Sequence, residues 1–445
     1  EEIKVIDPCM GSGHILVYAF DVLMQIYTSA GWDQREAAQS ILKNNLFGLD
    51  IDDRAAQLAY FAVMMKARQY DRRLLTRGIQ PNIHSIIESN ALGGAYKLAM
   101  GDFLLSKEHQ ETLNYLLDAF IDAKEYGSIL CLEKRDYVGL LRAWNLTASQ
   151  TTENLNLTLW FAAVEHEIPK LIEQAIILTQ GYDVVVTNPP YMAVSNAGAK
   201  VNDYVKKNFP DSKADLFAVF IERCGQMVKK NGYQAMITQH AWMFLSSFER
   251  MRECLLRSVD IVSLAHLGVG TFVDLNSKVV QSVSFVFQNA HVVDYTGRYD
   301  RLFEQQGLYE DNQEKEKWLI SGKHKFLTRQ EDFARIPGSP VAYWVSSAFL
   351  RAFETGVLLG KIADAKQGVA TADNNRFLRL WNEVSINKVS FHTHSHEEAA
   401  IAREKWFPYN KGGDFRKWYG NNEFVVNWEH DGAELKQFKG SVLRN

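Results

Sequence analysis

Short apolar runs alternate with amphipathic stretches along residues 1–290. The apolar runs predict buried strands at 3–6, 46–49, 96–100, 182–187, 233–238, 261–267 and 279–287. Between most of them apolar residues recur at helical spacing, as in 216–228, and Asn231-Gly232 is expected to end that helix. Strands that alternate with helices form a parallel sheet. The short link between the last two runs instead favours a hairpin, so we expect a mostly parallel, seven-stranded α/β sheet with an antiparallel last strand.

Two regions depart from this alternation. Residues 104–180 are helical in pattern, with Leu113, Leu117 and Phe120 on one apolar stripe. From about residue 295 the pattern changes, and 311–317 is a charged stretch typical of a linker. We therefore expect one domain at 1–290 with a helical insertion at about 104–180, and a C-terminal extension at 291–445.

Composition excludes several classes of protein. Of the 445 residues, 47% are hydrophobic and 23% charged, as in ordinary globular proteins. No apolar run approaches the ~20 residues of a membrane span, and no signal peptide is visible. The four cysteines are scattered without a CxxC pair, which argues against a zinc ribbon or a disulfide framework and fits the reducing cytoplasm. We predict no metal site. Because the net charge is −4, contact with nucleic acid would need a local basic surface.

The strand predicted at 182–187 ends in Asn188-Pro189-Pro190-Tyr191. Two consecutive prolines fix φ and remove two backbone donors, which leaves carbonyl oxygens and the Asn188 amide as the polar groups. An acceptor-rich corner followed by an aromatic ring suits a flat molecule with an amino group, such as a nucleobase. A simple turn is the alternative, but the full motif after a buried strand favours catalysis.

The first strand runs into a glycine-rich turn before a helix. Strand, turn and helix N-terminus together form a nucleotide-type cofactor site, and its candidate residues are Asp7, Pro8, Met10, Gly11 and Gly13. The third glycine of GxGxxG is missing, and a carboxylate at Asp7 would repel a pyrophosphate. It suits a cation such as the ammonium and sulfonium of S-adenosylmethionine. An ordinary turn remains the alternative.

Acidic residues follow the next two predicted strands. Asp50, with Ile51 beside it, ends the second strand, where a carboxylate can accept both hydroxyls of a ribose. Asp52 is a second candidate that could equally cap the next helix. After the third predicted strand, Asp102 can accept from the amino group of an adenine, and Phe103 can cover its ring.

In residues 403–445, basic residues alternate irregularly with aromatic residues. Bases for phosphates and rings for stacking are typical of a nucleic-acid surface. The edge of an aromatic core explains the pattern equally well. The candidate contacts are Lys411, Arg416, Lys417 and Trp418.

The order of these motifs resembles that of the amino-group DNA methyltransferases, and within them the gamma group of N6-adenine methylases. The resemblance rests on Asp7-Pro8, Gly11-Ser12-Gly13, Asp50, Asp102-Phe103 and Asn188 to Tyr191. Three further stretches are similar to the PglX methylases of BREX phage-defence systems and, more distantly, to type IIG restriction-modification enzymes. These are 7–14, 371–379 and 406–419.

The resemblance implies a Rossmann-like class I fold that binds S-adenosylmethionine. It implies methyl transfer to N6 of an adenine flipped out of double-stranded DNA. Asn188 and Pro189 would accept hydrogen bonds from N6, while Tyr191 and Phe272 would cover the base. Residues 291–445 would hold a linker and the start of a DNA target-recognition region, and other defence-system proteins would be partners.

Two other functions stay open. Asn-Pro-Pro-Tyr also serves methyltransferases that act on a protein glutamine or on an RNA amino group, although the long insertion and the basic, aromatic tail favour DNA. A DNA-binding subunit of a defence complex that is inactive alone is the second. The chain begins at Glu1 and ends at Asn445, and we expect a fragment of a longer protein that lacks the family's N-terminal helical region.

Overall fold

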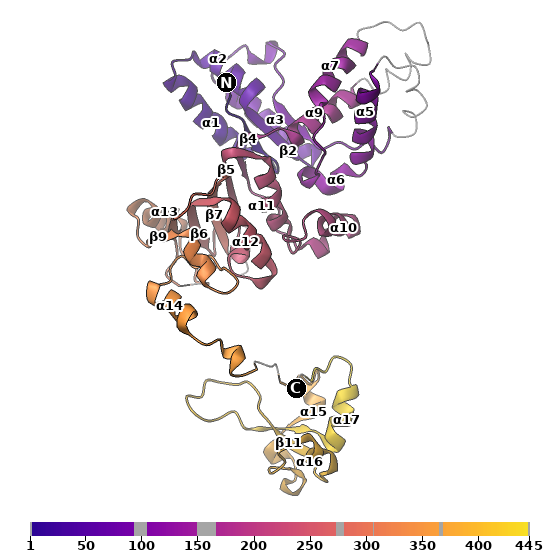
Figure 1. The fold of residues 1–445 in the computed structure, drawn as a ribbon, viewed down its shortest axis with the longest axis vertical. Helices are drawn as coiled ribbons and strands as arrows, with labels where there is room; N and C mark the ends of the chain where they lie inside the picture. Colours follow the sequence, from indigo (N-terminus) through magenta and orange to yellow (C-terminus); the bar gives the residue numbers. More distant parts are fainter. Residues whose placement is uncertain are drawn as a thin grey trace. The chain divides into compact units, whose positions relative to one another are not determined.

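The computed structural model describes residues 2–92, 105–148, 166–272, 280–305, 307–364 and 368–443. The chain folds into two compact units, Glu1–Glu354 and Thr355–Asn445 (Figure 1). Each unit is described by itself below. Among the described helices, none combines the length and apolar character needed to cross a membrane.

One twisted sheet organises the first unit. Its strands, in spatial order, are β3 (Asn82–Ser85), β2 (Leu46–Asp50), β1 (Val5–Asp7), β4 (Tyr182–Thr187), β5 (Val228–Gln239), β7 (Ser282–Gln288), β6 (Asp260–Gly268), β8 (Thr296–Arg301) and β9 (Lys325–Arg329). The strands from β3 to β5 are parallel, and β7 runs antiparallel to both of its neighbours. The first seven positions confirm the predicted class I methyltransferase fold with its antiparallel last strand.

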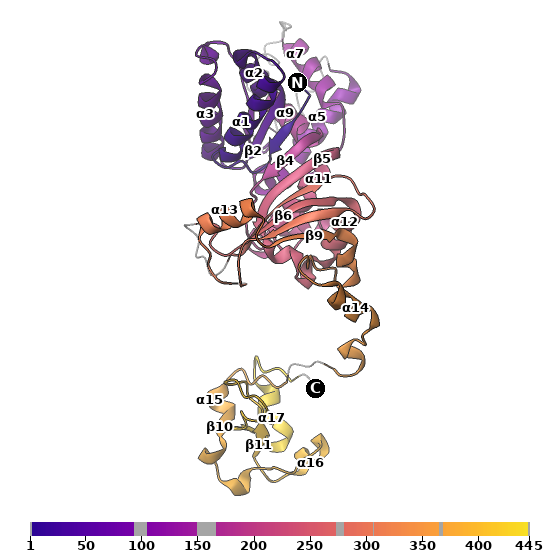
Figure 2. The same ribbon diagram turned by 90° about the vertical axis from the view of Figure 1, so that its left-hand side faces the viewer.

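Helices cover both faces of the sheet (Figure 2). One face carries α1 (His14–Ser29), α2 (Gln34–Ser40) and α3 (Asp53–Arg68). The insertion and the later helices share a second core with the strands; they are α5 (Lys107–Ala119), α6 (Ala123–Tyr126), α7 (Tyr137–Ala148), α9 (Glu167–Thr179), α10 (Ala199–Asn208), α11 (Leu216–Met227) and α12 (Glu249–Ser258). The helices pack on the sheet because each has an apolar side. In α1, for example, buried residues recur at helical spacing: Leu16, Phe20, Leu23 and Tyr27.

One element-level expectation was wrong and another stays untested. The third strand of the sheet is Asn82–Ser85, whereas the predicted 96–100 lies outside the described residues. The helix expected to end at Asn231-Gly232 ends at Met227, and β5 starts directly after it. Asn231 takes a positive φ of 66° there, and the pairing of β4 with β5 shifts register over the same stretch. The turn signal therefore marks an irregular start of a strand.

The sheet continues past residue 290. Strand β8 pairs parallel with β6, and β9 pairs antiparallel with β8. Helices α13 (Asn312–Ser321) and α14 (Ser347–Thr355) follow in the same region. The first compact unit thus extends beyond the boundary expected at 290, because two more strands complete its edge. The functional division into methyltransferase and recognition parts stays a prediction.

The second unit is small. A three-stranded antiparallel sheet contains β10 (Leu378–Leu380), β12 (Phe424–Asn427) and β11 (Trp406–Tyr409), in that order. Its helices are α15 (Asn374–Phe377), α16 (His396–Ile401) and α17 (Glu429–Gln437). Buried Phe377, Val426, Trp428 and Leu435 form its core.

Candidate active site

The carboxyl ends of β1, β2 and β4 lie at the same edge of the sheet, because these neighbouring strands are parallel. The chain order reverses between β1 and β4. Ligands of open α/β sheets bind in the crevice at such a reversal. The motifs selected from the sequence follow these three strands, so the topology brings them together.

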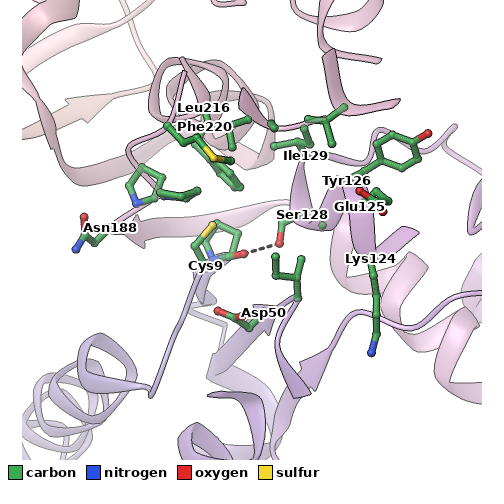
Figure 3. A pocket seen from close by; sticks show the side chains of 18 residues that line it. Cys9, Asp50, Lys124, Glu125, Tyr126, Ser128, Ile129, Asn188, Leu216 and Phe220 are labelled. Atoms are coloured by element: carbon green, nitrogen blue, oxygen red, sulfur yellow. Dashed lines mark hydrogen bonds between the residues drawn. The ribbon is translucent and has the colours of Figure 1, made fainter. Parts of the chain in front are cut away.

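A cavity of about 540 Å³ opens at this edge, within the size range of cofactor pockets. Seven of its wall residues come from the three strand ends: Pro8, Cys9, Asp50, Ile51, Asn188, Pro189 and Pro190. Figure 3 shows Asp50 on one side, with Leu216 and Phe220 of α11 across from it. Six of the predicted site residues therefore share one cavity: Pro8, Asp50, Ile51, Asn188, Pro189 and Pro190.

The glycine-rich turn is tied to Asp50. The amide of Gly11 donates to Asp50 Oδ2 at 2.9 Å, and the amide of Asp52 donates to Oδ1 at 2.9 Å. Asp52 itself caps α3 by accepting from Arg54 N at 2.7 Å, which settles its role as a cap. Asp50 is left facing the cavity.

Gly13 closes the turn with φ +85° at the N-cap of α1. A Cβ atom there would lie 2.9 Å from both Cα and Cβ of Ala59 on α3. The glycine therefore permits both the left-handed backbone and the close approach of the two helices.

Four of the described residues predicted to bind the cofactor lie off the cavity wall: Gly11, Gly13, Met10 and Asp7. Met10 is buried against Gly48 in the core between α1 and β2. Asp7 is 1% exposed, and its Oδ1 accepts from Thr187 Oγ1 at 2.6 Å and from Cys9 N at 3.0 Å. Burial, and secondarily the charge of Asp50, raises the pKa of Asp7 to about 7. The carboxyl of Asp7 is thus buried and bound within the protein, and it does not line the cavity.

The Asn-Pro-Pro corner combines an exposed amide with a rigid backbone. Asn188 is exposed and, within the described part of the chain, its side chain forms no hydrogen bond. Pro189 is buried beside it. The preceding Thr187 is 1% exposed and held by Asp7. A free amide on an anchored strand end can accept a hydrogen bond from a ligand.

The ring of Tyr191 lies beside this corner and off the cavity wall. Its hydroxyl donates to Ile237 O at 3.2 Å, and burial raises the pKa of that hydroxyl above its usual range. The rings of Tyr191 and Phe272 are 6.4 Å apart at 61°. The structure thus brings the two predicted base-covering residues into edge-to-face contact.

The helical insertion supplies a cavity wall that the sequence did not reveal. Residues 124–129 line the cavity, and the hydroxyl of Ser128 donates to the Pro8 carbonyl (Figure 3). Buried Arg223 on α11 donates to the carbonyls of Ser128, Leu130 and Leu178 at 2.9–3.1 Å. Arg223 holds this wall through hydrogen bonds to backbone carbonyls. Because every residue has such a carbonyl, no side-chain pattern in the sequence identifies the wall.

Asp102 and Phe103 lie outside the described residues. In the second unit, the aromatic residues divide into two groups. Tyr409, Phe424 and Trp428 belong to the core or pack against it, whereas Phe415, Trp418 and Tyr419 are 87%, 88% and 86% exposed. The aromatic-core interpretation therefore holds for the first group, whereas contact of the exposed second group with nucleic acid stays a prediction. Lys411, Arg416 and Trp418 line one open polar groove, and Lys417 lies 5.4 Å from the Trp418 ring.

No cluster of three or more potential metal ligands occurs in the described ranges.

The sequence of the chain matches a known protein family. The model of the Eco57I restriction-modification methylases matches residues 44–272, which include Asp50 and the Asn-Pro-Pro-Tyr corner. The chain belongs to this methylase family. The match confirms the family suggested by the order of the motifs.

Two curated relatives of this methylase align over nearly all of its length. The adenine-specific methyltransferase PglX of Lacticaseibacillus casei (strain Zhang) is 40% identical over 98% of the chain and 36% of the relative. The adenine-specific methyltransferase BrxX of Escherichia coli O9:H4 (strain HS) is 40% identical over 100% of the chain and 37% of the relative. They confirm the resemblance to PglX methylases, and the chain spans little more than a third of their length.

One solved structure that is similar to this chain is that of a nuclease-deletion mutant of the type ISP restriction-modification enzyme LlaGI in complex with a DNA substrate mimic. It is 10% identical and covers 79% of this chain and 25% of its own, with a TM-score of 0.48.

Proposed function

We propose that this chain is the methyltransferase part of a site-specific DNA methyltransferase that is adenine-specific. It transfers a methyl group from S-adenosylmethionine to N6 of a flipped-out adenine, in a phage-defence or restriction-modification system. One observation carries the proposal: Asp50 and the Asn188-Pro189-Pro190 corner line the same cavity. The names of the PglX and BrxX relatives support adenine as the target.

The cavity fits the cofactor. Each oxygen of Asp50 accepts one backbone hydrogen bond, and a carboxylate oxygen can accept two. Asp50 therefore keeps capacity for two ribose hydroxyls. Ile51, Leu216 and Phe220 add apolar wall. S-adenosylmethionine, when bound, supplies an electrophilic methyl group on a sulfonium.

Asn188 and Pro189 prepare the nucleophile. The Oδ1 of Asn188 and the carbonyl of Pro189 accept hydrogen bonds from the two N6 protons. Through these bonds, Asn188 and Pro189 would draw the amine from planar conjugation toward a tetrahedral form and so hold its lone pair ready to accept the methyl group that the bound cofactor would supply. Positioning is the main contribution. The extra proton would pass to water after transfer, because methylation makes the nitrogen acidic.

The target base has to leave the duplex to reach this corner. Tyr191 and Phe272 would stack on its two faces. In the structure their rings meet edge to face, so they have to separate before a base enters between them. The second unit would contact double-stranded DNA. Its basic side chains, Lys411, Arg416 and Lys417, would bind phosphates, and the ring of Trp418 would stack. Other proteins of the defence system are the remaining partners that we propose.

The experiment measures transfer of tritiated methyl groups by the full-length protein to duplex DNA, RNA and protein. Asn188→Ala should lower kcat on DNA by about a hundredfold or more, as removal of a group that acts in the transition state does. Affinity for the cofactor should change by less than about twofold. Asn196→Ala is the control, because this exposed asparagine follows the same motif and lies off the cavity wall.

Three outcomes contradict the proposal. Wild-type rates on DNA with Asn188→Ala would remove Asn188 from the mechanism. Methylation of RNA or of a protein glutamine instead of DNA would change the substrate. The full-length protein could bind the cofactor but methylate nothing until partner proteins are added. That result would favour a DNA-binding subunit that is inactive alone.

A further inference from the structure

Asp7 joins two strand ends. It is the last residue of β1, and Thr187 is the last residue of β4. Its Oδ1 accepts from the Thr187 hydroxyl at 2.6 Å and from the Cys9 amide at 3.0 Å. Cys9 lines the cavity, and Thr187 directly precedes Asn188. One buried oxygen atom thus connects the cofactor turn to the catalytic corner.

The backbone does not make this connection. The parallel pairing of β1 with β4 comprises Val5 with Val184 and Ile6 with Val185. Thr187 pairs on its other side, with Met236 of β5. Between β1 and β4, the side-chain bond from Thr187 to Asp7 therefore extends the link past the last paired residues, up to the edge where the cavity opens.

Packing alone does not explain a carboxyl at this position. Both Asp7 and Thr187 are 1% exposed, and Asp7 Oδ2 has no hydrogen-bond partner in the described part of the chain. A buried polar atom without a partner costs folding free energy. Because the pKa of Asp7 is raised to about 7, Oδ2 can carry a proton while Oδ1 accepts both bonds.

We propose that Asp7 is a positioning residue that holds Asn188 in register with the cofactor turn, through Thr187 and Cys9, and does not itself contact the cofactor. The proposal rests on the function proposed above. It differs from the sequence-based hypothesis in which Asp7 faces a cationic ligand, since the carboxyl is buried and does not line the cavity.

The two roles of Asp7 separate in kinetics. In the full-length protein, Thr187→Val removes the donor and leaves Asp7 in place. Loss of one buried hydrogen bond is expected to lower kcat about tenfold, with the affinity for S-adenosylmethionine, measured by calorimetry, within about twofold. Thr187→Ser keeps the hydroxyl and should restore most of kcat. Thr112→Val, a buried threonine on α5, is the matched control.

Asp7→Asn provides the opposing test. Its amide oxygen can still accept from Thr187 and Cys9, so a positioning role predicts that cofactor affinity stays within about twofold. Direct contact with a sulfonium or ammonium predicts at least a tenfold loss of affinity, while Thr187→Val changes nothing. That pattern would overturn the proposal.

Hydrogen exchange separates this proposal from the proposed function. Thr187→Val should speed amide exchange both at Tyr191-Met192 and in the turn around Cys9, and Thr187→Ser should not. This readout needs no methylation, so it tests the link even if the wild-type protein leaves DNA unmodified. Unchanged exchange at either end would overturn the proposal.

Discussion

At the scale of single residues, Asp7 gives the first unit a pH-dependent stability. Burial raises the pKa of Asp7 to about 7, whereas in an unfolded chain it is about 3.9. Between these values the folded state holds a proton that the unfolded state has lost. The stabilisation is therefore complete below the unfolded value and is lost as pH rises through 7.

The expected outcome is a fall in the free energy of unfolding between about pH 5 and about pH 8, of roughly 2 to 3 kcal/mol from this carboxyl. Urea unfolding of the wild type and of Asp7→Asn measures it, because the asparagine cannot titrate. Equal pH dependence in both proteins would assign the effect to other groups.

Gly13 and Gly31 allow a matched comparison of strain with crowding. Both have nearly the same backbone, with φ of +85° and +83°. A Cβ at Gly13 meets Ala59 at 2.9 Å, whereas at Gly31 nothing lies within 4 Å. Gly13→Ala should therefore destabilise the protein by about 1 to 3 kcal/mol more than Gly31→Ala, the usual range for overpacking. Chemical denaturation measures the difference, and equal losses would contradict it.

At the scale of elements, strands with long apolar runs were predictable and short or irregular ones were not. Strand β4 has the bounds expected from its apolar residues, Tyr182–Thr187. Strand β3, Asn82–Ser85, has one fully buried residue and no apolar run. In β5, Asn231 takes a left-handed φ of 66°, and the register of the pairing with β4 shifts over this stretch. The turn signal was therefore real, but it marks an irregularity inside a strand and not the end of a helix.

The candidate site divides in the same way. Residues at strand ends carry their chemistry in side chains, so Asp50 and Asn188 could be selected from sequence. The 124–129 wall could not, because Arg223 positions it through backbone carbonyls. Asp7 was selected for the right turn, but its direction depends on Thr187, far away in sequence.

The insertion wall should matter for cofactor binding. Arg223→Met removes three hydrogen bonds and leaves the carbonyls of Ser128, Leu130 and Leu178 without their donor. We expect affinity for S-adenosylmethionine to fall about tenfold or more, as each unsatisfied buried group costs about 1 to 3 kcal/mol. Calorimetry tests this with Arg135→Met as control, since Arg135 pairs with Glu133 away from the cavity. Unchanged affinity would mean that the wall holds without Arg223.

At the scale of the whole molecule, the proposed methyl transfer lies in the first compact unit, and the proposed phosphate contacts lie in the second. If the second unit binds phosphates, Arg416→Ala and Lys417→Ala should each weaken binding to any DNA sequence. Each should also reduce the slope of log affinity against log salt by about 1. Filter binding at several salt concentrations measures both, and Arg257→Ala on α12 is the control. An unchanged slope would show that Arg416 and Lys417 do not contact DNA phosphates.

The position of β1 between β2 and β4 has a consequence for synthesis on the ribosome. Residues of β1 emerge before those of its neighbour β4, and the bond between Asp7 and Thr187 spans 180 positions. At about 5 to 20 residues per second, one edge of β1 waits on the order of 10 to 35 s for its partner. During that time an apolar strand edge stands open to other chains. Slower translation would lengthen that wait, so the yield of folded protein should depend on chaperones that shield the nascent strands β1 and β2.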